Sequence, residues 1–357
     1  MFRLNGRLNK TKGLFMFEES RTIQISVIMP IYRTKEEYLR LAIESVLTQS
    51  FRDFEFIILN DSPDDKRLRE IVYSFGDKRV RYYENEGNVG IARSYNKLLD
   101  LAEGKYIALM NHDDEMKNER LAKQFSFLEQ NQDVGLVGTA YKKFGEVNRF
   151  KNIICPIGHD EILAYFLFKS PVHHPTIMMR NSIIKEHKIS YDDKFISLND
   201  RLLCWEFSKY SKISNLDEVL YKYRFHKDMT SKKMKKDIRK ERALFHKLWF
   251  EYNKVELNPE EVEVFDNYIT FGRAKIRDKE IIKIVVRVLE KLVDINDNKN
   301  FLNKDVFEKV CASYARKRCL NAIFCGFVNV GDLIKNTNLP LKKKKQILLF
   351  NTVFGWR

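Results

Sequence analysis

The feature that most constrains the fold is a series of short apolar runs, each ending in polar residues and followed by a helical pattern. The runs are IQISVIMPIY, FEFIILNDS, RVRYYENE and KYIALMN, all within residues 23–111. Between the first two, apolar residues recur at i, i+4 and i+7, and Thr34 with Glu37 has the spacing of a helix capping box. Strands that alternate with helices in this way predict an α/β fold with a mostly parallel sheet flanked by helices.

Residues that could bind a ligand lie at the carboxyl ends of three predicted strands. Pro30 to Tyr32 end the first, Asp61 follows the second, and Asn111 to Asp114 follow the fourth. In open α/β sheets, ligands bind beyond the carboxyl ends of the strands, so we expect one ligand site at this edge. No G-x-G-x-x-G follows the first strand, and no G-x-x-x-x-G-K-[ST] occurs. The usual dinucleotide site is therefore not expected, and a P-loop is excluded.

Paired carboxylates at such an edge predict a metal site. Mg²⁺ and Mn²⁺ take one or two carboxylates together with phosphate oxygens and water, and Asp113 with Asp114 provides that pair. The alternative is a simple turn, since Asp is common at strand ends. Asp61 could accept a hydrogen bond from a nucleobase or form an Asx-turn. Arg93 could contact a phosphate or the base, or be a surface arginine.

The positive charge lies mainly in the last third of the chain. The net charge is +15, of which residues 231–357 carry +12, from 28 Lys and Arg against 16 Asp and Glu. Long helix-like stretches with few turn signals predict a basic α-helical region there. Such a surface suits nucleic acid, anionic lipid or acidic glycans, although a solvated helix face is the alternative.

Several features indicate a cytoplasmic protein. No apolar run approaches the roughly 18–20 residues of a membrane span. Residues 1–23 lack the apolar core of a signal peptide and are interpreted as an N-terminal extension. Five cysteines without a CxxC motif indicate reduced thiols. Residues 339–357 set four lysines beside apolar side chains, which suits a peripheral contact with the anionic inner face of a membrane, or a capping helix packed on its own domain.

Residues 24–230 resemble the family 2 inverting glycosyltransferases of the GT-A fold, of the type that builds bacterial polysaccharides and lipooligosaccharides. The segments that carry the resemblance are VIMPIYRTKEEYLRLAIESVLTQSFRDFEFIILNDSPDD, NEGNVGIARSYNKLLDLAEGKYIALMNHDDEMKNERL, HHPTIMMRNSIIKE, LNDRLLCWEF and YRFH. The resemblance implies a GT-A nucleotide-diphospho-sugar transferase domain over residues 24–230. It does not cover the α-helical region over residues 231–357.

The resemblance also implies a role for each site residue. Asp200 matches the catalytic base, and Asn111-His112-Asp113 occupies the D-x-D triplet of the donor site. The other predicted residues are Pro30, Ile31, Tyr32, Asp61 and Arg93 for the nucleotide, Asp113, Asp114 and His226 for the metal, and His174 and Asn199 on the acceptor side.

Two residues depart from the family pattern, because Asn111 replaces the first Asp of D-x-D and Asn199 replaces the Glu before the base. An asparagine brings no charge to a metal, so we assign the metal to the later pair of aspartates. The processive signature Gln-x-x-Arg-Trp is absent, which favours addition of one sugar at a time.

The predicted function is transfer of a sugar from a nucleotide diphosphate, with UDP as the expected carrier, to a glycan or lipid-linked acceptor. Mn²⁺ or Mg²⁺ is the expected cofactor, and no nucleic-acid partner is expected. One alternative is a nucleotidyltransferase, which usually needs a Gly-rich loop that PIYRTKEEY lacks. The other is a non-catalytic nucleic-acid- or membrane-binding protein, which would leave Asp61, Asp113, Asp114 and Asp200 unexplained. Asp200 could also be a helix N-cap.

Overall fold

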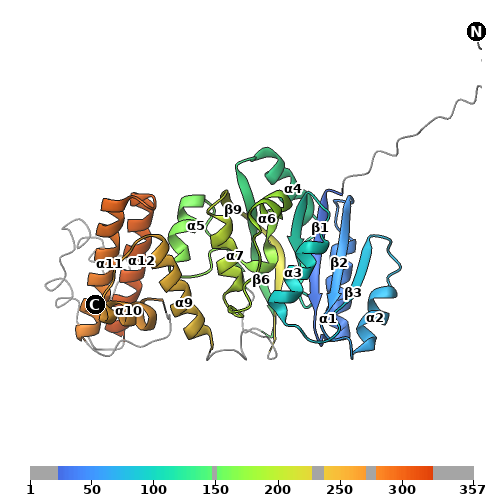
Figure 1. The fold of residues 1–357 in the computed structure, drawn as a ribbon, viewed down its shortest axis with the longest axis horizontal. Helices are drawn as coiled ribbons and strands as arrows, with labels where there is room; N and C mark the ends of the chain where they lie inside the picture. Colours follow the sequence, from blue (N-terminus) through green and yellow to red (C-terminus); the bar gives the residue numbers. More distant parts are fainter. Residues whose placement is uncertain (1–22, 147–150, 227–236, 271–278, 325–357) are drawn as a thin grey trace, which may run out of the picture.

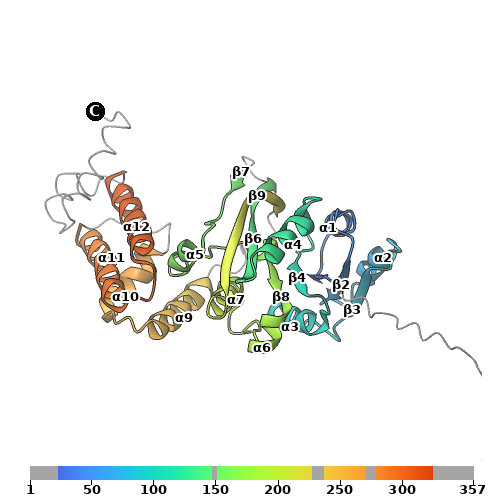
Figure 2. The ribbon, with the colours of Figure 1, turned by 90° about the horizontal axis from the view of Figure 1, so that it is seen from above.

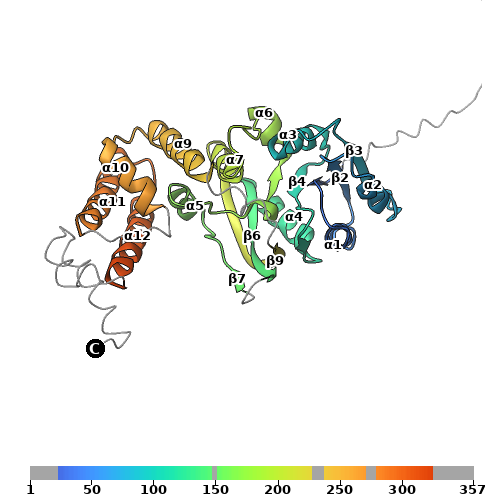
Figure 3. The same cartoon turned by 90° about the horizontal axis from the view of Figure 1, so that it is seen from below.

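The structure is a computed structural model that describes residues 23–146, 151–226, 237–270 and 279–324. The molecule is elongated, with a helix-flanked sheet at one end and a group of helices at the other (Figure 1). Figure 2 and Figure 3, each turned by 90°, show α9 (Asp237–Tyr252) running between these two parts. No helix in the described ranges is both long and apolar enough to cross a bilayer.

One nine-stranded sheet organises the described part of the chain. Its strands are β1 (Ile25–Ile31), β2 (Phe54–Asn60), β3 (Val80–Glu84), β4 (Tyr106–Leu109), β5 (Glu115–Met116), β6 (Val134–Gly145), β7 (Lys151–Ile153), β8 (Met178–Arg180) and β9 (Lys212–Phe225). The order is β3-β2-β1-β4-β8-β6-β9-β5, with β7 beside β6. The predicted parallel strands β1 to β4 form one half, and β6 pairs with β9 in parallel. Antiparallel pairs of β8, β5 and β7 with their neighbours make the sheet mixed.

Helices cover both faces of the sheet. They are α1 (Glu36–Leu47), α2 (Lys66–Tyr73), α3 (Ile91–Leu101), α4 (Arg120–Gln130), α5 (His159–Phe166), α6 (Asn181–His187) and α7 (Asn199–Phe207), with a 3₁₀ turn η1 (His174–Thr176). Because successive side chains of a strand point to opposite faces of the sheet, β1 contributes residues to two hydrophobic clusters, one on each face. Val27 and Met29 pack with α1, α2 and α4, and Ile28 packs with α3 and α7.

The predicted α-helical C-terminal region is confirmed for the described residues. Its elements are α9, α10 (Pro259–Val264), a π-helical turn η2 (Phe265–Ile269), α11 (Lys279–Lys299) and α12 (Lys304–Phe324). Its buried residues Trp249, Leu289 and Phe307 belong to the same hydrophobic core as Phe166 of α5 and Leu203 of α7. The region therefore closes the α7 face of the sheet domain. The basic segment 339–357 lies outside the described residues.

The start of α1 differs from the prediction. The helix begins at Glu36, its N-cap residue is Lys35, and no side chain caps it. Thr34 is instead buried in the turn that follows β1. The capping box predicted from Thr34 and Glu37 is therefore wrong, although the helix itself is confirmed.

Candidate active site

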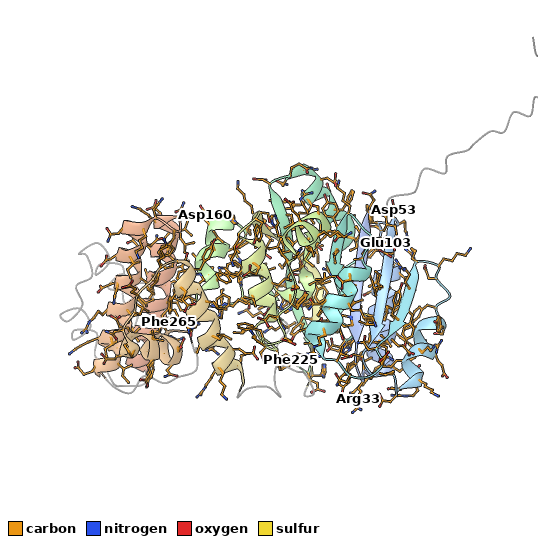
Figure 4. The ribbon with its side chains drawn as sticks, in the orientation of Figure 1. Arg33, Asp53, Glu103, Asp160, Phe225 and Phe265 are labelled. Carbon is orange, nitrogen blue, oxygen red and sulfur yellow. The ribbon has the colours of Figure 1, made fainter. Side chains whose placement is uncertain are left out.

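The ends of the parallel strands meet at one edge of the sheet, as predicted. Figure 4 shows Arg33, just after β1, and Phe225, at the end of β9, near the lower edge. Asp53 and Glu103, which precede β2 and β4, lie near the upper edge in the same view. The candidate site is therefore built on the edge that carries Arg33 and Phe225.

Asp61, the residue after β2, is buried and holds the loop that leads into α3. Its Oδ1 accepts hydrogen bonds from Asn85 Nδ2 at 2.8 Å and from the Val89 N–H at 2.9 Å, and its Oδ2 accepts from the Gly90 N–H at 3.0 Å. These partners belong to another segment, so the contacts are not those of an Asx-turn. A carboxylate has about four acceptor positions, which leaves Oδ2 one position for a further donor.

The turn after β4 gives its two aspartates different surroundings. Asp114 is completely buried, and its carboxylate accepts from the Arg224 N–H at 2.7 Å, from Asn111 Nδ2 at 2.9 Å and from the Tyr221 hydroxyl at 3.0 Å. Burial, reinforced by the charge of Asp113, raises the pKa of Asp114 well above its usual range. Asp114 thus ties the turn to β9. An aspartate at position 111 would set a second carboxylate against it, which gives a physical reason for Asn111.

Asp113, the residue before Asp114, also contacts the end of β9. Its Oδ2 is 2.9 Å from His226 Nε2, and its backbone carbonyl accepts from Arg224 Nε at 2.7 Å. In the described ranges no group of three or more His, Cys, Asp and Glu side chains is assembled for a metal. A metal bound with a nucleotide needs only one or two protein ligands beside phosphate oxygens, so the Asp113–His226 pair fits this requirement. The imidazole favours Mn²⁺ over Mg²⁺.

An aromatic stack lies beside the β4 turn, where the Tyr95 hydroxyl is 3.5 Å from Asn111 Oδ1. Tyr95 of α3 stacks on Tyr191 with ring centroids 4.8 Å apart, and His174 meets both rings edge-on. His174 Nε2 lies 2.8 Å from the Tyr191 hydroxyl. Burial raises the pKa of both tyrosines, assisted by the charge of Asp114 at Tyr95 and of Asp200 at Tyr191. Burial lowers the pKa of His174 to about 4, so its ring is neutral at pH 7.

Asp200 is the second residue of α7 and is partly buried. Its Oδ1 accepts from the Arg201 N–H at 2.7 Å. Leu198 is the N-cap residue of the helix, so the N-cap alternative for Asp200 is wrong. Burial raises the pKa of Asp200 to about 6, although Arg201 and Ser170 both act to lower it. The carboxylate is therefore ionised at pH 7, and its pKa lies near enough to pH 7 for it to accept a proton during a reaction.

The other predicted nucleotide residues differ in exposure. Pro30 and Ile31 lie inside β1 and are buried, whereas Tyr32 is 40% exposed. Arg93 is an exposed residue of α3, and its Nη2 pairs with Asp193 Oδ2 at 3.0 Å. The structure therefore joins Arg93 to the segment that precedes α7, rather than to the ends of β1 and β2.

Asn199 and His112, two further residues predicted for the site, each place a polar side-chain atom in a buried position. The Asn199 side chain is buried, and its Nδ2 donates to the Phe195 carbonyl. His112 is partly buried, and its Nδ1 is a buried atom without a hydrogen-bond partner in the described part of the chain. Neither residue contacts the Asp200 carboxylate in the described hydrogen bonds.

Sequence reasoning missed the residues that hold these groups in place. Asn85 could have been found, because it follows the predicted third strand as Asp61 follows the second. Tyr221 and Arg224 had no local signal, since they contact Asp114 from more than 100 residues along the chain. Asn96 had none either, although it exchanges two hydrogen bonds, of 2.7 and 2.9 Å, with the backbone of Tyr191.

Comparisons with known proteins find related glycosyltransferases. A family model described as Glycosyl transferase family 2 matches residues 26–188. An uncharacterised glycosyltransferase of Methanocaldococcus jannaschii is 31% identical over 298 residues, which cover 77% of this chain and 94% of the relative. The O-antigen biosynthesis glycosyltransferase WbnJ of Escherichia coli is 32% identical over 217 residues, which cover 58% of this chain and 82% of WbnJ.

Solved structures share the fold. The crystal structure of S. aureus TarS in complex with UDP has a TM-score of 0.54 and 17% identity, covering 82% of this chain and 91% of that one. The TarS complex with UDP-GlcNAc has a TM-score of 0.53 at 16% identity, covering 83% and 92%. The likeness to TarS extends beyond residues 26–188 and includes part of the C-terminal helices, since it covers so much of the chain.

Proposed function

The chain belongs to glycosyltransferase family 2 and has the GT-A fold, and we propose that it transfers a sugar from a nucleotide diphosphate to an acceptor hydroxyl with inversion. The observation that carries the proposal is Asp200, a partly buried carboxylate of raised pKa near the aromatic stack beside the β4 turn. Family membership favours this function over a nucleotidyltransferase and over a non-catalytic binding protein.

In this proposal Asp200 is the general base. An alcohol is a poor nucleophile at neutral pH, and a positioned base contributes about 10²–10⁴-fold to the rate. A pKa of about 6 leaves Asp200 ionised at pH 7 and able to take the hydroxyl proton as attack begins. Attack from the face opposite the leaving group is a single displacement, so the anomeric carbon inverts and no covalent nucleophile is needed.

Asp113 and His226 are the proposed ligands of Mn²⁺ or Mg²⁺. When bound, such an ion acts as a Lewis acid toward the diphosphate and is worth several kcal/mol. Asp114, predicted as a second ligand, supports the turn in this proposal, because its carboxylate is buried and already accepts three hydrogen bonds. Asn111 completes the support by donating to Asp114.

UDP is the proposed nucleotide. Tyr32 and Asp61 follow the paired residues Ile31 and Asn60, so an exposed ring and a carboxylate lie side by side at the strand ends. The remaining acceptor position of Asp61 Oδ2 suits the N3–H of uracil. TarS, which shares the fold, has structures with UDP and with UDP-GlcNAc, and this supports the same class of donor.

The proposed acceptor is a glycan or lipid-linked glycan of cell-surface polysaccharide synthesis. The name of the relative WbnJ, an O-antigen biosynthesis enzyme, supports this class. Neutral His174 and the Tyr191 hydroxyl form a hydrogen-bonding pair near Asp200, which suits the hydroxyl groups of a sugar. The enzyme adds one sugar at a time in this proposal.

A screen of nucleotide sugars by thermal stabilisation with MnCl₂ tests the proposed donor. A ligand that binds only the folded state at 100 times its Kd stabilises the protein by about 2.7 kcal/mol. We expect a UDP-sugar with Mn²⁺ to raise the melting temperature, and the same UDP-sugar to release UDP during turnover. Stabilisation by nucleic acid, with none by any nucleotide sugar, would contradict the proposal.

We also propose a cytoplasmic enzyme that meets the inner face of the membrane through residues 339–357. The support is composition, since Lys342 to Lys345 adjoin an apolar stretch that ends with Trp356. Deleting residues 339–357 should weaken binding to phosphatidylserine-containing liposomes, while UDP binding stays unchanged. Equal liposome binding by the shortened and full-length chains would contradict the membrane role.

A further inference from the structure

Glu241, in the first half of α9, reaches the segment that carries Asp200. It is only 6% exposed, and its Oε2 accepts hydrogen bonds from the Ser197 N–H at 2.7 Å and from the Leu198 N–H at 3.0 Å. Leu198 is the residue from which α7 starts, two positions before Asp200. A residue of the C-terminal region therefore binds the backbone directly before the proposed base.

The segment from Tyr191 to Leu198 is held from two sides. On the donor side, Asn96 of α3 exchanges two hydrogen bonds with the backbone of Tyr191. On the other side, Glu241 accepts the two amides of Ser197 and Leu198. The segment before Asp200 is thus anchored both to a helix that follows the donor edge and to a helix that lies outside residues 26–188, which the family model matches.

The packing of α9 against α7 supports this contact. Phe245, one turn after Glu241, lies edge-on to Trp205 of α7 with ring centroids 5.6 Å apart, and Tyr252 meets the same indole at 5.4 Å. The Arg201 guanidinium lies 4.1 Å from the centre of the Phe245 ring. Residues 241, 245 and 252 therefore share the face of α9 that lies against α7. Figure 2 and Figure 3 both show α9 beside α7.

We infer that Glu241 is the positioning residue for Asp200 and that the C-terminal region contributes to the rate of transfer through it. The inference rests on the proposed role of Asp200 as the base. A displacement of about 1 Å at a reacting group can cost roughly 10²-fold in rate. The loss of this anchor should therefore lower kcat and leave the affinity for UDP unchanged.

The geometry distinguishes positioning from a charge effect. Both hydrogen bonds end on the same oxygen, Oε2, so the single carbonyl oxygen of a glutamine could accept both. An aspartate keeps the charge but is one methylene too short to reach. A positioning role therefore predicts that Glu241→Gln retains most activity, Glu241→Asp less, and Glu241→Ala least.

The test measures UDP release from UDP-GlcNAc with MnCl₂, UDP affinity by calorimetry, and amide hydrogen exchange of residues 192–203, all on the full chain. We expect Glu241→Ala to lower kcat by about 10- to 100-fold and to speed exchange of this segment, with unchanged UDP affinity. Glu241→Gln should stay within a few-fold of wild type in both readouts. Glu251→Ala is the matched control, since Glu251 is an exposed residue of the same helix.

Each outcome decides the inference. Loss of activity in Glu241→Gln as great as in Glu241→Ala would overturn it, and so would unchanged exchange of residues 192–203 in Glu241→Ala. If Glu241→Ala does not fold, the inference is tested by whether Glu241→Gln is more active than Glu241→Asp, and equal activity or the reverse order would overturn it. If the wild-type protein does not turn over UDP-GlcNAc, the inference is tested by amide hydrogen exchange alone, which should be faster in residues 192–203 of Glu241→Ala. Asp200→Asn separates the two proposals: activity retained there contradicts the base, whereas activity lost there and kept in Glu241→Ala contradicts only the positioning role.

Discussion

The two halves of the candidate site are held in different ways. Asp61 and Asp113 each follow a strand of the parallel half of the sheet within a few residues, so strand register places them. Asp200 lies in a helix whose start is fixed by Glu241, more than 40 residues later in the chain. With the proposed roles of these residues, donor binding and the chemical step depend on separate parts of the molecule. Changes near α7 and α9 should act on rate, and changes at the strand ends on binding.

The largest effect should follow from removing the base. Asp200→Asn should lower kcat by about 10²–10⁴-fold and leave UDP affinity unchanged, because the carboxylate is needed only for proton transfer. The pKa of Asp200 is raised on folding to about 6, so its ionised form costs stability above that pH. The variant should therefore melt no lower than wild type at pH 7. Asp193→Asn, at an exposed neighbour, is the control, and equal losses of UDP affinity and rate in Asp200→Asn would break the comparison.

The next effect tests the two adjacent aspartates against each other. Asp113→Asn should weaken UDP binding in the presence of Mn²⁺ by roughly tenfold or more, because it removes a proposed ligand. Calorimetry with and without MnCl₂ checks this, and UDP binding without the ion should not change. A variant that retains the full Mn²⁺ effect would show that Asp113 is not a ligand.

Asp114→Asn should instead act on stability. It sets an amide N–H₂ where three donors now converge, at a cost of about 1–3 kcal/mol in the free energy of unfolding. The removal of a buried carboxyl group whose pKa is raised offsets part of this cost. Chemical denaturation measures the loss. A stable Asp114→Asn protein that has lost its Mn²⁺ response would contradict the division of roles and restore Asp114 as a ligand.

Asp61→Ala should combine a moderate loss of stability with weaker donor binding. The change leaves the buried donors of Asn85, Val89 and Gly90 without their acceptor, at a cost of about 1–3 kcal/mol. Thermal melting and UDP calorimetry check the two parts. A variant with lower stability but full UDP affinity would assign Asp61 to the loop alone.

The smallest effect is expected at Arg93. Its ion pair with Asp193 joins two side chains that are 66% and 56% exposed, and such pairs contribute about 0–1 kcal/mol. Arg93→Ala should therefore change neither melting temperature nor UDP affinity appreciably. A marked loss of UDP affinity would return Arg93 to the nucleotide site predicted from the sequence.

The parallel half of the sheet and its ligand edge could be predicted because strand ends follow from local patterns. The burial of Asp114 could not be predicted from the sequence, because it depends on contacts with Tyr221 and Arg224 far along the chain. The sequence pattern groups Pro30 and Ile31 with Tyr32, but the sheet buries the first two and leaves Tyr32 exposed. Glu241 lies in a region interpreted only as basic and helical, where periodicity carries no information about a single buried carboxylate.

The pH dependence of kcat tests the central claim, that a carboxylate in α7 takes the proton of the acceptor. Burial gives Asp200 a pKa of about 6, and in the proposed mechanism its ionised form is the active one. The rate at saturating UDP-sugar and MnCl₂ should therefore fall about tenfold per pH unit below pH 6 and level off above it. In Asp200→Asn, the fall in rate below pH 6 should be absent. A flat profile in wild type, or the same fall in Asp200→Asn, would contradict the claim.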